Sequence, residues 1–203
     1  MTASTQRQFL MDLLARQPIV RAFELRSAGI HPPTISRAVA DGEIVRIARG
    51  LYQRADGEVD AEQSLAEASK LVPRGVVAMT SALAFHGLTD QMPRQIWIAI
   101  SAKDWAPVTS YPPIRIVELS EKYMHDGIEL HRISGIEVPI FSVAKTLADV
   151  FRGKLVDRSV AIEGLREALR LRKATPSEIA KAAMSGGAWK RMRPYLEALT
   201  SNG

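Results

Sequence analysis

The chain has 203 residues, of which 46% are hydrophobic and 24% are charged. This is the composition of a folded globular protein and excludes a disordered one. The absence of cysteine excludes disulfide bonds and thiol catalysis and argues against structural zinc. No segment approaches the roughly 18 consecutive apolar residues of a membrane span, and the N-terminus lacks the apolar core of a signal peptide. We therefore expect a soluble, cytoplasmic protein.

The formal net charge is +5, and it is unevenly distributed along the chain. Residues 1–54 contain eight arginines, no lysine and four acidic residues, whereas residues 55–153 contain thirteen acidic and nine basic residues. Residues 154–203 again have an excess of bases, with ten against five acids. A basic head and a basic tail indicate two surfaces that could bind polyanions. The alternative is that most of these charges only solvate helices.

The first 54 residues have the pattern of a winged helix-turn-helix domain. Apolar residues of the first predicted helix form one stripe: Phe9, Leu10, Leu13 and Leu14. Three helices are predicted at 4–16, 21–28 and 32–41. An extended link at 19–21 joins the first two helices, and a hairpin at 43–54 follows the third. About fifty residues make a marginal core, so we expect this domain to lean on the rest of the chain or to be only just stable.

The third predicted helix is the candidate recognition helix. Pro32 and Pro33 suit its first turn, where a missing N–H costs nothing. Ile35 and Val39 are four residues apart and are expected to point inward. Residues near the N-terminus of such a helix reach base edges in the major groove, and arginines in the wing meet phosphates or the minor groove. The expected DNA-binding residues are Thr34, Ser36, Arg37, Arg46, Arg49 and Arg54.

Residues 55–60 are polar and are expected to link this domain to an α+β domain over 61–203. Its sheet part, about 76–141, is predicted to be small and mainly antiparallel. Strands are expected at 76–78, 95–100, 114–119, 127–133 and 135–141, with helices at 61–72 and at 81–86, the latter capped by Thr80.

The helical part, about 142–203, has two strong helix starts. Ser142 is predicted to cap a helix over 143–152, and Thr175-Pro176-Ser177-Glu178 is a capping box. Further helices are expected at 157–172 and 188–200. A second polyanion-binding surface is expected at the basic side chains Arg166, Arg170, Arg172 and Lys173.

Enzyme motifs are missing from the sequence, and we predict no catalytic residue, metal site or cofactor. Glu129 and His131 alternate on a predicted strand, but two ligands do not make a metal site. His86 before Gly87 is read as a helix C-terminus, where a cationic imidazole would favour the helix dipole. A nucleic-acid-processing enzyme acting through the middle of the chain is the least favoured alternative.

Three blocks of this sequence resemble the AbiEi-type antitoxins. Residues 10–53, with SRAVADGEIVRIARGLY, resemble the N-terminal winged-helix domain of that family. TSALAFHGLTDQMPRQIWIAI resembles its next block. GIEVPIFSVAKTLADVFR resembles a later strand-then-helix block, with Lys145, Thr146, Leu147 and Asp149 in matching places. The blocks occur in the family's order and span most of the chain.

This resemblance implies an antitoxin of a type IV toxin–antitoxin, or abortive-infection (phage-defence), system. It further implies that the winged helix represses its own operon by binding inverted repeats in double-stranded promoter DNA. The functional partner would be a nucleotidyltransferase-like toxin, which the antitoxin need not contact. The resemblance assigns the countering of the toxin to the C-terminal domain, where the expected antitoxic surface is the basic group Arg166, Arg170, Arg172 and Lys173. A winged helix that binds the toxin or another protein directly is the alternative.

Overall fold

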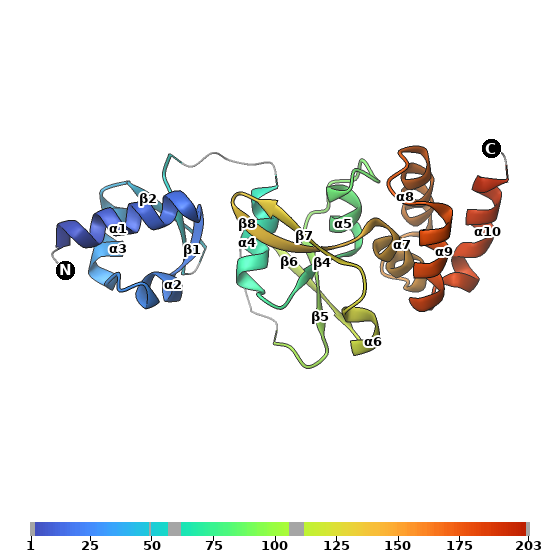
Figure 1. Cartoon of the computed structure of the whole chain (residues 1–203), viewed down its shortest axis with the longest axis horizontal. Helices are drawn as coiled ribbons and strands as arrows, with labels where there is room; N and C mark the ends of the chain where they lie inside the picture. Colours follow the sequence, from blue (N-terminus) through green and yellow to red (C-terminus); the bar gives the residue numbers. More distant parts are fainter. Residues whose placement is uncertain (1–2, 49, 57–61, 106–111, 202–203) are drawn as a thin grey trace.

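The computed structural model describes residues 3–48, 50–56, 62–105 and 112–201. Three parts follow one another along the long axis of the molecule (Figure 1). The winged domain lies at one end, the sheet of the second domain in the middle, and the C-terminal helices at the other end. Residues 57–60 of the predicted linker lie outside the described residues. No helix in the described part of the chain combines the length and the hydropathy that crossing a bilayer requires.

The N-terminal part folds as a winged helix-turn-helix, as its sequence predicted. Its elements are α1 (Ala3–Arg16), β1 (Ile19–Arg21), α2 (Ala22–Ser27), α3 (Pro32–Ala40), β2 (Ile44–Ala48) and β3 (Leu51–Arg54). The turn between α2 and α3 needs Gly29, whose φ is +83°. Residues 19–21, expected to be a link, form a third strand, and the antiparallel sheet has the order β1-β3-β2.

The winged domain has a small core of its own and shares a second one with the rest of the chain. Its own core contains the buried side chains Leu10, Leu14, Val20, Leu25, Ile30, Ile35, Ala38 and Ile44. Ile19 and Leu51, which are also buried, pack instead with Leu65, Ile133 and other residues of the second domain. The expectation that this small domain leans on the rest of the chain is therefore confirmed.

Polar contacts reinforce the seam between the domains. Lys70 Nζ lies 2.9 Å from Glu24 Oε1, and the Gln63 side-chain amide donates to Gln53 Oε1 at 2.7 Å. Glu24 also accepts a hydrogen bond from the backbone N–H of Arg21 at the start of α2. One carboxylate therefore both begins the first helix of the helix-turn-helix pair and ties it to the second domain.

The second domain contains a five-stranded sheet with helices around it. Its elements up to residue 141 are α4 (Gln63–Leu71), β4 (Val76–Val77), α5 (Met79–Phe85), β5 (Ile96–Ser101), β6 (Ile114–Leu119), α6 (Glu121–Met124), β7 (Ile128–Ile133) and β8 (Ile136–Phe141). Helix α5 begins before the expected cap Thr80, with Ala78 as its N-cap residue. The α+β class is confirmed.

The strand pairings differ from the mainly antiparallel sheet that we predicted. The order is β6-β5-β4-β8-β7. Pairs β7–β8 and β4–β5 are antiparallel, whereas β5–β6 and β4–β8 are parallel. Among the described residues of this sheet, only the β7–β8 hairpin joins neighbouring strands through a tight turn. The two-residue strand β4 enters between β8 and β5, and tertiary packing rather than local turn chemistry decides its partners.

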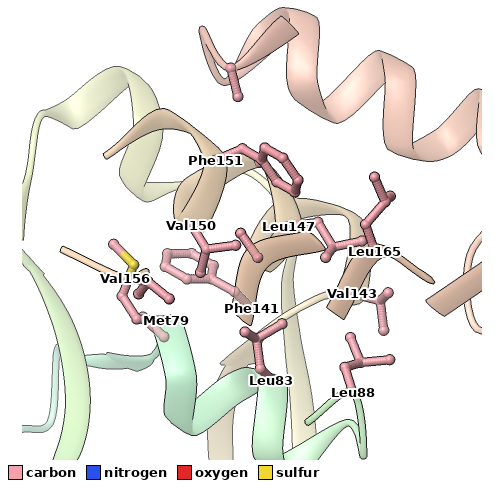
Figure 2. Packing of buried hydrophobic residues seen from close by; sticks show 14 of the residues in the cluster. Met79, Leu83, Leu88, Phe141, Val143, Leu147, Val150, Phe151, Val156 and Leu165 are labelled. Carbon is pink, nitrogen blue, oxygen red and sulfur yellow. The ribbon is translucent and has the colours of Figure 1, made fainter. Parts of the chain in front are cut away.

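The C-terminal helices begin where their caps predicted. The helices are α7 (Val143–Arg152), α8 (Arg158–Arg170), α9 (Pro176–Ser185) and α10 (Trp189–Thr200). Ser142 Oγ accepts from the N–H of Lys145, and Thr175 forms a reciprocal capping box with Glu178. Figure 2 shows Leu147 and Phe151 of α7 packing with Phe141, Leu83 of α5 and Leu165 of α8. Helix α7 is thus the central element of the largest core.

A buried ionic cluster lies on α7 beside this core. Asp149 Oδ1 is 2.8 Å from Lys145 Nζ and 2.7 Å from a guanidinium nitrogen of Arg152. The Asp149 side chain is fully buried and that of Lys145 is 6% exposed. Burial raises the pKa of Asp149 and lowers the pKa of Lys145, although each ion favours the charged form of the other. Removing one partner would leave an uncompensated charge inside the protein.

Candidate nucleic-acid interface

Helix α3 presents one face to solvent, and this face differs in part from the prediction. Thr34, Ile35 and Ala38 are buried, whereas Ser36 and Arg37 are exposed. Val39, which we expected to point inward, has 37% of its surface exposed. The helix has few apolar residues, so the i, i+4 spacing of Ile35 and Val39 did not decide which face is buried. The buried face instead consists of Thr34, Ile35 and Ala38, which have the spacing i, i+1 and i+4.

The prediction that the Thr34 side chain reads bases is therefore wrong, because this side chain is buried. It is 8% exposed, and its hydroxyl donates a 3.0 Å hydrogen bond to Gln6 Oε1 on α1. The amide nitrogen of Gln6, itself buried, donates to the carbonyl oxygen of Gly29 at 3.1 Å. Gln6 thus fixes both the helix-turn-helix turn and the N-terminal end of α3. No local signal identifies Gln6 in the sequence, because its partners lie 23 and 28 residues away.

The next residue of α1 fixes the other end of α3. The Arg7 guanidinium lies 2.6 Å from Asp41 at the C-cap of α3 and 2.7 Å from Glu43 before β2. These hydrogen bonds raise the pKa of Arg7, so its charge persists at any physiological pH. Two acidic groups beside the recognition helix are thereby paired with a cation. Gln6 and Arg7 together set the position of α3 against α1.

The predicted DNA-binding arginines of the wing differ in their exposure and in their ion pairs. Arg46 is exposed on β2. Arg54 donates from two nitrogens to Asp56, at 2.8 and 2.5 Å, and this pairing lowers the pKa of Asp56. Arg49 lies outside the described residues. Arg37 is exposed, and within the described ranges no carboxylate forms an ion pair with it. It is therefore the arginine of α3 that can pair with a ligand.

The second basic group lies at the end of α8 and in the turn that follows. Arg166, Arg170, Arg172 and Lys173 are all exposed. Arg170 and Arg166 both face Glu167, at 2.6 and 3.7 Å, and Lys173 donates to the His86 carbonyl oxygen. Three of these four cations have protein partners, so a polyanion surface here stays a prediction.

The Glu129–His131 pair lies on β7, with 3.3 Å between the carboxylate and the ring. Among the residues that the structure describes, no group of three His, Asp or Glu side chains could hold a metal ion. His131 instead packs edge-on against Phe85, with ring centroids 4.7 Å apart. Its observed contacts are those of a packing residue.

His86 ends α5 as predicted, with Gly87 at φ +63°, but the imidazole is not a surface cation. It is buried, and its Nε2 lies 2.8 Å from the carbonyl oxygen of Phe141, which can only accept a hydrogen bond. Burial lowers the pKa of His86, so the neutral ring is favoured. Its role is to connect α5 to the end of β8.

This lowered pKa makes stability depend on pH. The unfolded chain takes up a proton at His86 more readily than the folded chain, so stability should fall as pH drops below about 6.5. We expect thermal unfolding between pH 7.5 and 5.5 to show a larger fall in Tm for the wild type than for His86→Gln. The exposed His125→Gln variant is the control and should keep the wild-type fall. Equal pH dependence in all three proteins would contradict this assignment.

Comparisons with known proteins agree with the fold and with the identity of the winged domain. The RV2827C protein from Mycobacterium tuberculosis has a similar crystal structure, with a TM-score of 0.57 over 95% of this chain and 80% of that one. The two sequences are 14% identical, so the similarity concerns the fold. No curated protein matches the sequence significantly. The predicted resemblance is confirmed at the N-terminus: residues 8–55 match the family of transcriptional regulators described as AbiEi antitoxins.

Proposed function

We propose that this protein is a DNA-binding transcriptional repressor of its own operon and the antitoxin of a type IV toxin–antitoxin system. The observation that carries the proposal is the exposed Arg37 on α3, which has no ion pair among the described residues, in a winged domain whose sequence matches antitoxin regulators. Double-stranded DNA is the expected ligand, because a helix fits the major groove and arginine pairs bidentately with guanine. A nucleotidyltransferase-like toxin is the expected functional partner.

DNA binding is tested by fluorescence anisotropy of the purified full chain with its upstream region and with a scrambled duplex of equal length. We expect tighter binding to the upstream region, and a log affinity that falls linearly with log salt for both duplexes. Equal affinity for the two duplexes would leave a non-specific DNA-binding protein. If anisotropy does not change with either duplex and the neighbouring gene product co-purifies with the chain, the protein-binding alternative is favoured.

The antitoxin role is tested separately, by co-expressing the chain with a nucleotidyltransferase-like toxin encoded beside it. We expect growth to be restored by the wild type and equally by Arg37→Ala, because we assign repression to α3 and the antitoxic role to the second domain. Failure of the wild type to restore growth would remove the antitoxin role and leave the repressor role standing. Failure of Arg37→Ala alone would mean that the two roles are not separable.

Arg7 should affect DNA binding without touching DNA. Arg7→Ala frees the charges of Asp41 and Glu43 beside the recognition helix, where they repel phosphates. At low salt we expect affinity for any duplex to fall about fivefold to tenfold, which corresponds to roughly 1 kcal/mol for the two unpaired charges together. Adding Asp41→Asn and Glu43→Gln to Arg7→Ala should restore most of that affinity. If the triple variant binds as weakly as Arg7→Ala, repulsion by these acids is not the cause.

A further inference from the structure

The side of α3 that lies opposite its buried face has few polar groups. Pro33, Ser36 and Ala40, all exposed, follow an i, i+3, i+7 spacing and lie opposite the buried Ile35 and Ala38. We name these three residues the outward stripe. Its only polar group is one hydroxyl. A helix entering the major groove with this side first brings a pyrrolidine ring and a methyl group to the base edges.

The start of α3 cannot compensate through its backbone. A helix N-terminus ordinarily offers N–H groups to phosphate. Here Pro32 and Pro33 have no N–H, and that of Thr34 donates to the carbonyl oxygen of His31 at 2.9 Å. The first turn therefore has little to offer a phosphate oxygen, and its exposed surface is largely apolar. An apolar group on the DNA is the matching ligand.

The major groove has one prominent apolar group, the 5-methyl of thymine, and alanine is among the side chains that contact it. Arg37 lies next to the outward stripe around the helix axis and can take guanine. Resting on the DNA binding proposed above, we propose that the outward stripe reads thymine: Pro33 and Ala40 contact thymine methyl groups beside the base pair that Arg37 reads. The operator half-site should then contain a thymine close to a guanine.

The test removes the methyl group and nothing else. The full chain first selects its preferred duplex from a random-sequence library. Each thymine of that duplex is then replaced singly by deoxyuridine, which keeps base pairing and the O4 acceptor. For at least one thymine we expect the wild type to bind about fourfold more weakly, the equivalent of about 0.8 kcal/mol for one buried methyl group. Unchanged affinity at every thymine overturns the inference.

Two variants connect the effect to the outward stripe. In Pro33→Ser or Ala40→Ser, replacing the contacted thymine by deoxyuridine should cause no further loss, because the apolar partner is already gone. Pro176→Ser is the matched control: Pro176 is an exposed first-turn proline of α9, far along the chain. This control should keep the full fourfold effect. Unfolding curves check each variant, and Ala40→Ser keeps the test valid should Pro33→Ser fold poorly.

The possible outcomes distinguish a failure of this inference from a failure of the proposed sequence-specific DNA binding. If the library yields no preferred duplex, the proposed sequence-specific repressor fails and the inference fails with it. If a duplex is enriched and its methyl dependence persists undiminished in both stripe variants, sequence-specific DNA binding stands and the inference fails, because another element reads the thymine. Methyl dependence that disappears in Pro33→Ser or Ala40→Ser but not in Pro176→Ser supports the outward stripe.

Discussion

Replacing Asp149 by alanine lowers the free energy of unfolding by about 3–5 kcal/mol, which we expect to be the largest single effect in this chain. The change leaves Lys145 buried without its counter-ion and removes the carboxylate that pairs with Arg152. The lost pairing cannot be replaced by water at a site where the carboxylate is fully buried. Urea unfolding of the full chain, followed by circular dichroism, measures this loss.

Two comparisons isolate burial as the cause. Glu197→Ala breaks an exposed ion pair with Arg193 and should cost about 0–1 kcal/mol. The double variant Lys145→Met/Asp149→Leu removes both charges of the more deeply buried pair, Lys145 and Asp149, and should recover part of the loss. A loss below about 1 kcal/mol for Asp149→Ala would show that the cluster is hydrated and contributes little to stability.

Replacing Arg37 by alanine lowers affinity for the specific operator by about 1–3 kcal/mol and leaves affinity for random duplex nearly unchanged. The guanidinium is exposed on α3 and can make two hydrogen bonds to the guanine O6 and N7 atoms. Random duplexes seldom present a guanine in the right register, so little is lost on them. Anisotropy titrations on both duplexes at one fixed salt concentration give the two differences.

Two other arginines make this result specific. Arg46→Ala, on the wing, should weaken both duplexes equally and reduce the slope of log affinity against log salt by about one. Arg94→Ala, exposed in the second domain before β5, should change neither. Equal losses on specific and random DNA for Arg37→Ala would reassign Arg37 from bases to the phosphate backbone.

Local signals in the sequence located most of the helices and strands. Ser142 and the Thr175 capping box marked the starts of α7 and α9 because a cap depends on residues at most three apart. The strand pairs between β4 and its neighbours were not predictable in this way. Val77 pairs with Ile98 and Ile140, and only the folded core brings residues so distant in sequence together.

The candidate site was predictable only to the level of its helix. Pro32, Pro33 and Gly29 marked α3, but in a nine-residue helix the few apolar positions did not identify the buried face. Thr34 was therefore predicted to be exposed but is buried, and Val39 was predicted to be buried but is exposed. The contacts of Arg7 with Asp41 and Glu43 span 34 and 36 residues and have no local signature. His86 was placed correctly, whereas its protonation depends on burial that the sequence does not show.

The seam between the domains limits how this chain can be rearranged in evolution. Recombination readily exchanges domains whose surfaces are complete when they are separated. A break between residues 56 and 62 would instead expose Ile19 and Leu51 on one product and Leu65 and Ile133 on the other. A gene that acquires this winged helix must therefore also acquire a complementary surface. We expect the two domains to be inherited together, so that changes of operator arise by substitutions on α3.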